Sequence, residues 1–269
     1  MKNSTITDNR SSCGFTLVEV AIVLLIVGLM LGGMLMPLSA QIEQRNFTET
    51  EKNINYAKDA LVGYVLAHGR LPCPATDSSI GMEAFNAGGT PSNGDCAVFY
   101  NGLLPAATLG ITPVDSNGYA VDGWGGGDAN RIRYAVAATT INGIVKPFTT
   151  NGGLRNVGIA GVGNANLLYI CSGKPSGAAP YSDCTGTVTL TNNAVFVVYS
   201  VGKNAITGGI SSDEVINPNP QDGSTGNDPV FVSHVPQSSG SSGGEFDDTF
   251  NWLSSSILIA KMVAAEQLP

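Results

Sequence analysis

The sequence is poor in charged and histidine side chains. Only 13% of the 269 residues are charged, and the chain has two histidines. His68 and His234 stand outside any metal-ligand or nucleophile spacing, and no H-E-x-x-H, G-x-S-x-G or P-loop motif occurs. The glycine-rich stretch 158–163 follows no convincing strand, so we expect a loop there. These absences predict that the protein is not an enzyme.

Basic residues are also scarce. The chain carries 13 Lys and Arg against 21 Asp and Glu, a net charge of -8. Non-specific nucleic-acid binding needs a basic surface that displaces counterions, so no nucleic-acid partner is expected. Glycine is instead abundant, at 34 residues, which predicts a part of the chain rich in turns.

One long apolar stretch is present near the start, over residues 15–36. Its single ionisable side chain is Glu19. As a helix it would rise roughly 33 Å at about 1.5 Å per residue, which matches a bilayer core of about 30 Å. An acid inside such a helix costs about 2.5 to 3.5 kcal/mol and is usually kept because a cation pairs with it. The sequence therefore predicts a transmembrane helix in which Glu19 has a cationic partner.

The residues around this stretch set the domain organisation. Residues 1–14 are polar and carry Lys2 and Arg10, which favours a cytoplasmic start and a head outside the inner membrane. Beyond Pro37 the apolar residues recur at helical spacing, and Gly69 is a suitable stop. We predict a helix over 15–68, with 15–36 as its membrane part, and a globular head over 69–269.

The head favours an α+β fold, in which the long helix packs on an antiparallel sheet. Runs rich in β-branched and aromatic residues, bounded by turn residues, predict strands. Residues 213–228 are expected to form a long exposed loop, and a C-terminal helix is expected over 247–267 with Asp247 or Asp248 as its cap. The four predicted strands cover residues 131–138, 167–172, 194–201 and 229–235.

Four cysteines lie in the head, and Cys13 lies in the polar leader. An even number beyond a membrane segment indicates two disulfides formed in an oxidising compartment. A zinc site is disfavoured because no two of the four have the two-to-four-residue spacing typical of such sites. Three pairings are open, and the nearest-neighbour one closes the shortest loops. It joins Cys73 to Cys96 and Cys171 to Cys184.

One cluster of carboxylates lies in a glycine-rich segment. Asp115, Asp122 and Asp128 are hard oxygen donors of the kind that calcium accepts in loose geometry. Calcium is therefore the one candidate cofactor. The alternative is that Asp122 caps a turn while Trp124 packs against the long helix.

The start of the apolar stretch, Gly14-Phe15-Thr16-Leu17-Val18-Glu19, resembles the leader of type IV prepilins and pseudopilins. The resemblance implies cleavage after Gly14 by a membrane prepilin peptidase and methylation of the new Phe15 amine. That amine would then be the cation that pairs with Glu19 of a neighbouring subunit. Two departures are Cys13, where the family more often has Lys or Arg, and a leader of 14 residues. The turn at 122–125 is likewise similar to the D-P-W-G of major type II secretion pseudopilins, whose heads bind calcium in a later loop, with Gly123 in place of the proline.

The resemblance implies a structural subunit of a type IV pilus-like or type II secretion pseudopilus filament. A head of this size favours a minor or specialised subunit. Its expected partners are other pilin or pseudopilin subunits, the prepilin peptidase, the inner-membrane assembly platform and membrane lipid. The head would lie in the periplasm, or outside the cell after assembly. A secretory signal, a plain single-pass anchor and a monomeric anchored binding module or adhesin are the alternatives.

Overall fold

The computed structural model describes residues 14, 16–125, 127–205, 211–217, 228–241 and 243–268, without the side chains of residues 31–38. The chain divides into two compact units, Met1–Arg45 and Asn46–Pro269. The long helix α1, Leu17–His68, begins in the first unit and ends in the second. It ends before Gly69, which adopts a left-handed φ of 68° and donates its N–H to Val65 O at 2.8 Å, a glycine helix stop.

Within the described residues, no helix combines the length and apolar character that a bilayer crossing requires. The membrane helix predicted over residues 15–36 falls partly outside this description, because residue 15 and the side chains of residues 31–36 are not described.

The second unit is built on one six-stranded sheet in the order β1-β2-β4-β3-β5, with β6 also paired to β4. The long strand β4 is its centre, since it pairs antiparallel with β2, β3 and β6. One pair is parallel, β3 with β5. The strands are β1 Gly102–Leu103, β2 Arg133–Val136, β3 Leu168–Cys171, β4 Thr189–Ser200, β5 Val230–Val232 and β6 Thr249–Ser254.

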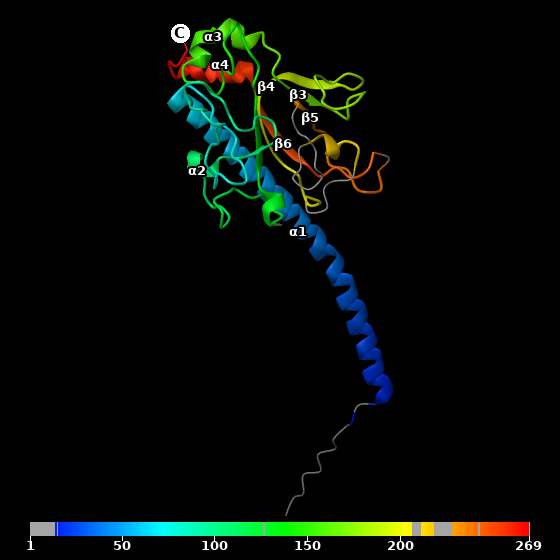
Figure 1. Ribbon diagram of the computed structural model, residues 1–269. Helices are drawn as coiled ribbons and strands as arrows, with labels where there is room; N and C mark the ends of the chain where they lie inside the picture. Colours follow the sequence, from blue (N-terminus) through cyan, green and yellow to red (C-terminus); the bar gives the residue numbers. More distant parts are fainter. Residues whose placement is uncertain are drawn as a thin grey trace, which may run out of the picture. The chain divides into compact units, whose positions relative to one another are not determined.

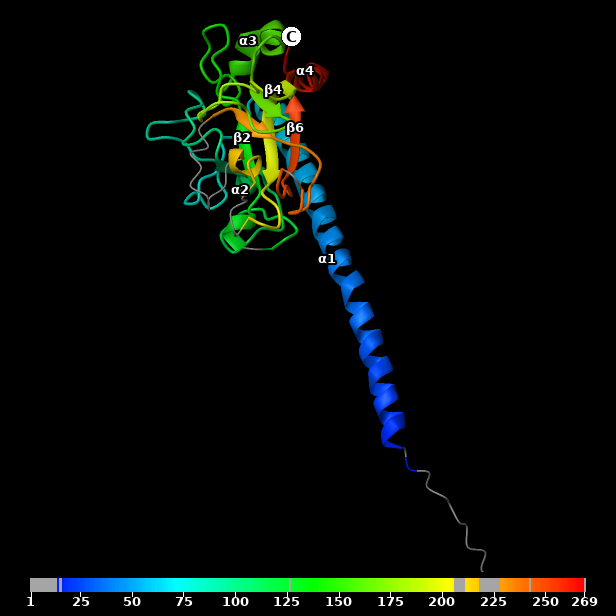
Figure 2. The same cartoon turned by 90° about the vertical axis from the view of Figure 1, so that its right-hand side faces the viewer.

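The last turns of α1 supply one side of the core. Ile54, Leu61 and Val65 are at most 1% exposed and share one apolar cluster with Tyr134 and Val198 of the sheet. Burying side chains of this size contributes about 1.5 to 3 kcal/mol each. Figures 1 and 2 show these turns running alongside the strands of the head.

Shorter helices complete the second unit. In both views α3 and α4 lie side by side at the end of the head that carries the C-terminus (Figures 1 and 2). The described short helices are α2 Ala106–Leu109, α3 Gly153–Gly163, α4 Ser255–Ala264 and the 3-10 turns Gly127–Asn130 and Glu214–Ile216.

The four strands expected from the sequence are confirmed as β2, β3, β4 and β5, but the C-terminal prediction is wrong in part. A helix was expected over 247–267, whereas residues Thr249–Ser254 form β6 and α4 begins only at Ser255. The N-cap residue is Ser254, and neither Asp247 nor Asp248 has that position. The reason is tertiary: β6 contains Thr, Phe and Trp, which suit a strand, and six of its residues pair with β4.

Three further expectations are corrected. Residues 158–163 belong to α3 and are not a loop. The helix is kinked at Gly158, whose φ is 73°. The sheet is not wholly antiparallel, because β3 and β5 run parallel. The expected exposed loop 213–228 begins with a turn in which Glu214 and Asn217 are buried; residues 218–227 lie outside the described residues.

Candidate functional site

The start of α1 is fixed by a side-chain cap. Thr16 precedes the helix, and its Oγ1 accepts a hydrogen bond from Glu19 N at 3.3 Å, beside a Thr16 O to Glu19 N bond of 3.0 Å. The T-x-x-E spacing is that of a capping box, and an acid in the first turn is favoured by the helix dipole. Glu19 is therefore compatible with the helix locally, even though it interrupts an apolar surface.

Exposed apolar side chains cover this first part of α1. Within residues 17–30 of the first unit, eleven large apolar side chains are 44% to 87% exposed, from Leu17 at 87% to Met30 at 67%. Contiguous apolar surface of this kind marks an interaction surface with protein or lipid.

The predicted processing site lies directly before this helix. Gly14 is exposed and lies outside α1, whereas Phe15 lies outside the described residues. Cleavage between them would leave Thr16 in place as the helix cap, because its bonds are to residues on its C-terminal side.

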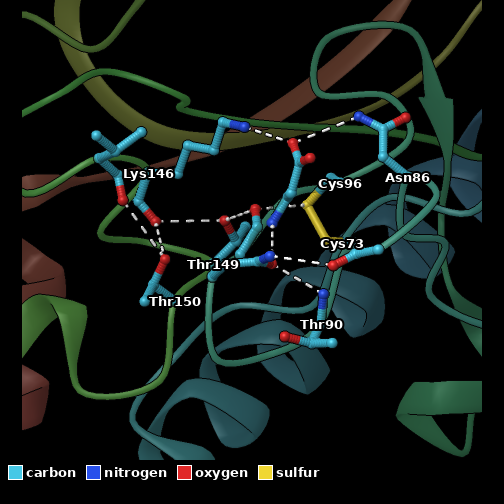
Figure 3. Close-up of polar contacts among 12 residues, drawn as sticks. Cys73, Asn86, Thr90, Cys96, Lys146, Thr149 and Thr150 are labelled. Atoms are coloured by element: carbon cyan, nitrogen blue, oxygen red, sulfur yellow. Dashed lines mark hydrogen bonds and ion pairs between the residues drawn. A yellow bond between two sulfur atoms is a disulfide. The ribbon is translucent and has the colours of Figure 1, made fainter.

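Two disulfides join the cysteines of the head in the nearest-neighbour pairing, Cys73–Cys96 and Cys171–Cys184. Figure 3 shows the first of them beside a polar network. There Asp95 pairs with Lys146, and Thr149 Oγ1 donates to Gly94 O at 2.8 Å. The segment that carries Cys96 is therefore fixed by an ion pair and a hydrogen bond as well as by the disulfide.

The three aspartates predicted to bind calcium have protein partners. Asp115 Oδ2 accepts from Arg131 Nε at 2.8 Å, and Asp128 Oδ1 lies 2.6 Å from Arg131 Nη2. Asp122 is buried apart from this pair, where it accepts from Ser200 Oγ and from Trp124 N. Asp122 thus caps a turn, as the alternative interpretation expected. In the described part of the chain these three carboxylates do not form one converging group of ligand atoms.

A different acidic cluster does converge, and the sequence analysis missed it. Glu214, Asp247 and Asp248 each offer an oxygen within 4.8 Å of the others. Each carboxylate also has one oxygen held by a protein donor. Glu214 Oε1 accepts from Asn204 Nδ2, Asp247 Oδ2 from Lys203 N, and Asp248 Oδ2 from Asn217 Nδ2.

The opposite oxygens of two of these carboxylates are buried without a donor, namely Glu214 Oε2 and Asp247 Oδ1. Burial, together with the nearby Glu214 charge, raises the pKa of Asp247 to about 7, and burial raises the pKa of Asp248 well above its usual range. Hard carboxylate oxygens oriented by a second shell are the donor set that calcium or magnesium accepts. The signal that the sequence offers for this cluster is the adjacent acid pair 247–248, a pattern that is also typical of a helix cap.

Taken together, the described chain has a long N-terminal helix with an exposed apolar first part, joined to a mixed helix and sheet head that is closed by two disulfides. Residues 9–35 match the family described as the prokaryotic N-terminal methylation motif. This is the signature of type IV pilins and pseudopilins, and it indicates a structural protein that is associated with a membrane or a cell surface. Comparison with curated proteins and with solved structures found no match.

Proposed function

We propose that the protein is a structural subunit of a type IV pilus-like or type II secretion pseudopilus filament. In this proposal the chain is cleaved after Gly14, and the new amino terminus at Phe15 is methylated. The observation that carries the proposal is the methylation motif over residues 9–35, which coincides with the exposed apolar surface of α1. A neighbouring subunit or lipid would cover that surface. The size of the head supports a minor or specialised subunit.

Glu19 is the assembly residue in this proposal. Its carboxylate would pair with the methylated Phe15 amine of an adjoining subunit. The head would lie in the periplasm until assembly. The prepilin peptidase and an inner-membrane assembly platform are the further partners. The role is structural, so no catalytic residue is assigned.

The test follows two quantities, the mature amino terminus and the amount of protein in sheared filaments. Mass spectrometry should find methylated Phe15, and an intact Met1 would contradict the proposal. Glu19→Ala should still be processed, yet it should enter filaments less, because the incoming amine would lose its counter-charge in a medium of low dielectric.

The matched control is Glu51→Ala, which removes an exposed acid from the same helix within the second unit. It should enter filaments as the unaltered chain does. Equal incorporation of the Glu19 variant and the unaltered chain would refute the pairing and would favour the monomeric anchored module.

A further inference from the structure

Three arginines are buried in the head, and they differ in their partners. Arg70, Arg131 and Arg133 are 3% to 4% exposed. Arg70 pairs with Glu83 at 2.7 Å, and Arg131 pairs with Asp115 and Asp128. Arg133 forms no ion pair with a carboxylate among the described residues. A buried charge without a counter-charge is costly, so this guanidinium requires an explanation.

The hydrogen bonds of Arg133 are also incomplete. Its Nη1 donates to Asn101 Oδ1 at 2.7 Å, and its Nε is buried without an acceptor. A guanidinium carries five N–H donors in a planar fork that matches a carboxylate. A neutral amide on one nitrogen therefore satisfies a small part of what this side chain can donate.

Two carboxyl groups, Asp248 and Asp77, lie near Arg133, but neither forms an ion pair with it among the described residues. The Asp248 carboxyl accepts a hydrogen bond from Asn217 Nδ2 and belongs to the acidic cluster with Glu214 and Asp247. Asp77 lines the same cavity as Arg133 but is not joined to it by an ion pair.

Arg133 lines a cavity of about 220 Å³ together with Thr76, Asp77, Val98 and Asn101. The cavity is smaller than the roughly 300 to 1,000 Å³ of pockets for drug-sized ligands. It holds several waters at about 30 Å³ each, and it therefore suits a small molecule.

Two chain segments that form the walls of this cavity are pinned together. Residues 75–77 follow Cys73 closely, residues 98 and 101 follow Cys96, and a disulfide joins the two cysteines. Gly102 allows the segments to approach closely, since a Cβ there would lie 2.3 Å from Pro74 Cβ. The cavity is thus a preformed feature of the fold.

We propose that this cavity binds the carboxylate of a small monocarboxylic acid, with Arg133 as the residue that recognises the anion. The fork of Arg133 supplies charge-assisted hydrogen bonds to the carboxylate. Thr76 and Asn101 contribute polar groups to the lining of the cavity, and Val98 contributes an apolar side chain. Asp77 on the same wall repels any anion, and it repels the more highly charged inorganic phosphate more strongly, so a monocarboxylate is bound in preference to phosphate.

The test is a titration of the full chain with sodium acetate at constant ionic strength, with chloride replaced by acetate and heat of binding as the readout. The expected result is saturable binding at one site. Arg133→Gln should weaken the affinity by about tenfold to a hundredfold, the effect of a charge-assisted hydrogen bond. Arg155→Gln, which removes an exposed arginine from α3, should leave the affinity unchanged.

A second variant keeps the arginine and guards against a folding defect. Asn101→Asp places a carboxylate at the atom that already lies 2.7 Å from Nη1, so it should raise the melting temperature and abolish acetate binding. The proposal is overturned if the unaltered chain shows no saturable acetate binding, if Arg133→Gln or Asn101→Asp binds acetate as the unaltered chain does, or if inorganic phosphate binds more tightly than acetate.

Discussion

Gly123 is the point where the turn at 122–125 meets α1, and it offers a sharp test of how the head is docked. Its N–H donates to Thr50 Oγ1 of α1 at 2.9 Å. A Cβ built at residue 123 would lie 2.2 Å from Asn46 O, a backbone atom of the same helix. Helix backbone cannot yield as a side chain does, so Gly123→Ala must displace the turn.

The cost follows from these two contacts. Overpacking of this kind costs about 1 to 3 kcal/mol, and loss of the Thr50 hydrogen bond costs about 0.5 to 1.5 kcal/mol. The sum is about 1.5 to 4.5 kcal/mol. For a chain of this size it corresponds to a fall of roughly 3 to 18 °C in melting temperature.

Thermal unfolding followed by circular dichroism measures the effect, with two controls. Gly125→Ala faces open space but has a φ of 66°, so it should cost about 1 to 2 kcal/mol from backbone strain alone. Thr50→Val removes the hydroxyl that accepts from Gly123 N and donates to Asn46 O at 2.8 Å, without adding a Cβ at residue 123. A Gly123→Ala chain that melts within about 2 °C of the unaltered chain would refute the argument.

The same contact also disfavours proline at residue 123. Proline has no N–H, so it cannot donate to Thr50, and its ring atoms would enter the space next to Asn46 O. Gly123→Pro should therefore destabilise the head at least as much as Gly123→Ala. An unchanged or higher melting temperature would show that the turn can dock by another route.

Two further predictions concern the covalent and ionic bonds of the head. Non-reducing peptide mapping should recover Cys73 with Cys96 and Cys171 with Cys184, whereas peptides that join the two groups would contradict the pairing. Calcium, if it binds the head, should raise the melting temperature, by the equivalent of about 2.7 kcal/mol at a hundredfold excess over its dissociation constant. Asp247→Asn should abolish that rise and Asp115→Asn should not, since Asp115 already pairs with Arg131; the reverse result would place the ion at the cluster predicted from the sequence.

The sequence predicts the elements that have a clear periodicity and misses those whose type depends on distant partners. The strands β2 to β5 are bounded by turn residues, which makes them readable locally. β6 runs directly into α4 at Ser254 and Ser255, and no turn residue separates the two. Only its pairing with β4 makes residues 249–254 a strand.

The acidic cluster was missed for a similar reason. Glu214 lies 33 residues before Asp247 in the sequence, and its Oε1 accepts a hydrogen bond from Asp247 N at 3.2 Å. A Cβ at Gly202 would lie 2.0 Å from Asp247 Oδ1, and the φ of Gly202 is 72°. A glycine in a left-handed turn thus admits the carboxylate, a relation between distant residues that no local pattern predicts.

Arg131 and Arg133 are two residues apart, yet the sequence does not predict that their surroundings differ. Both stand in one extended segment and both are buried, so the sequence offers no reason to separate them. Their difference lies in what faces them. Two separate turns before the strand supply Asp115 and Asp128 to Arg131, whereas the segment facing Arg133 supplies the amide of Asn101. Because an amide carries no charge, Arg131 is neutralised by its two carboxylate partners, whereas Arg133 is a buried cation that lines a cavity.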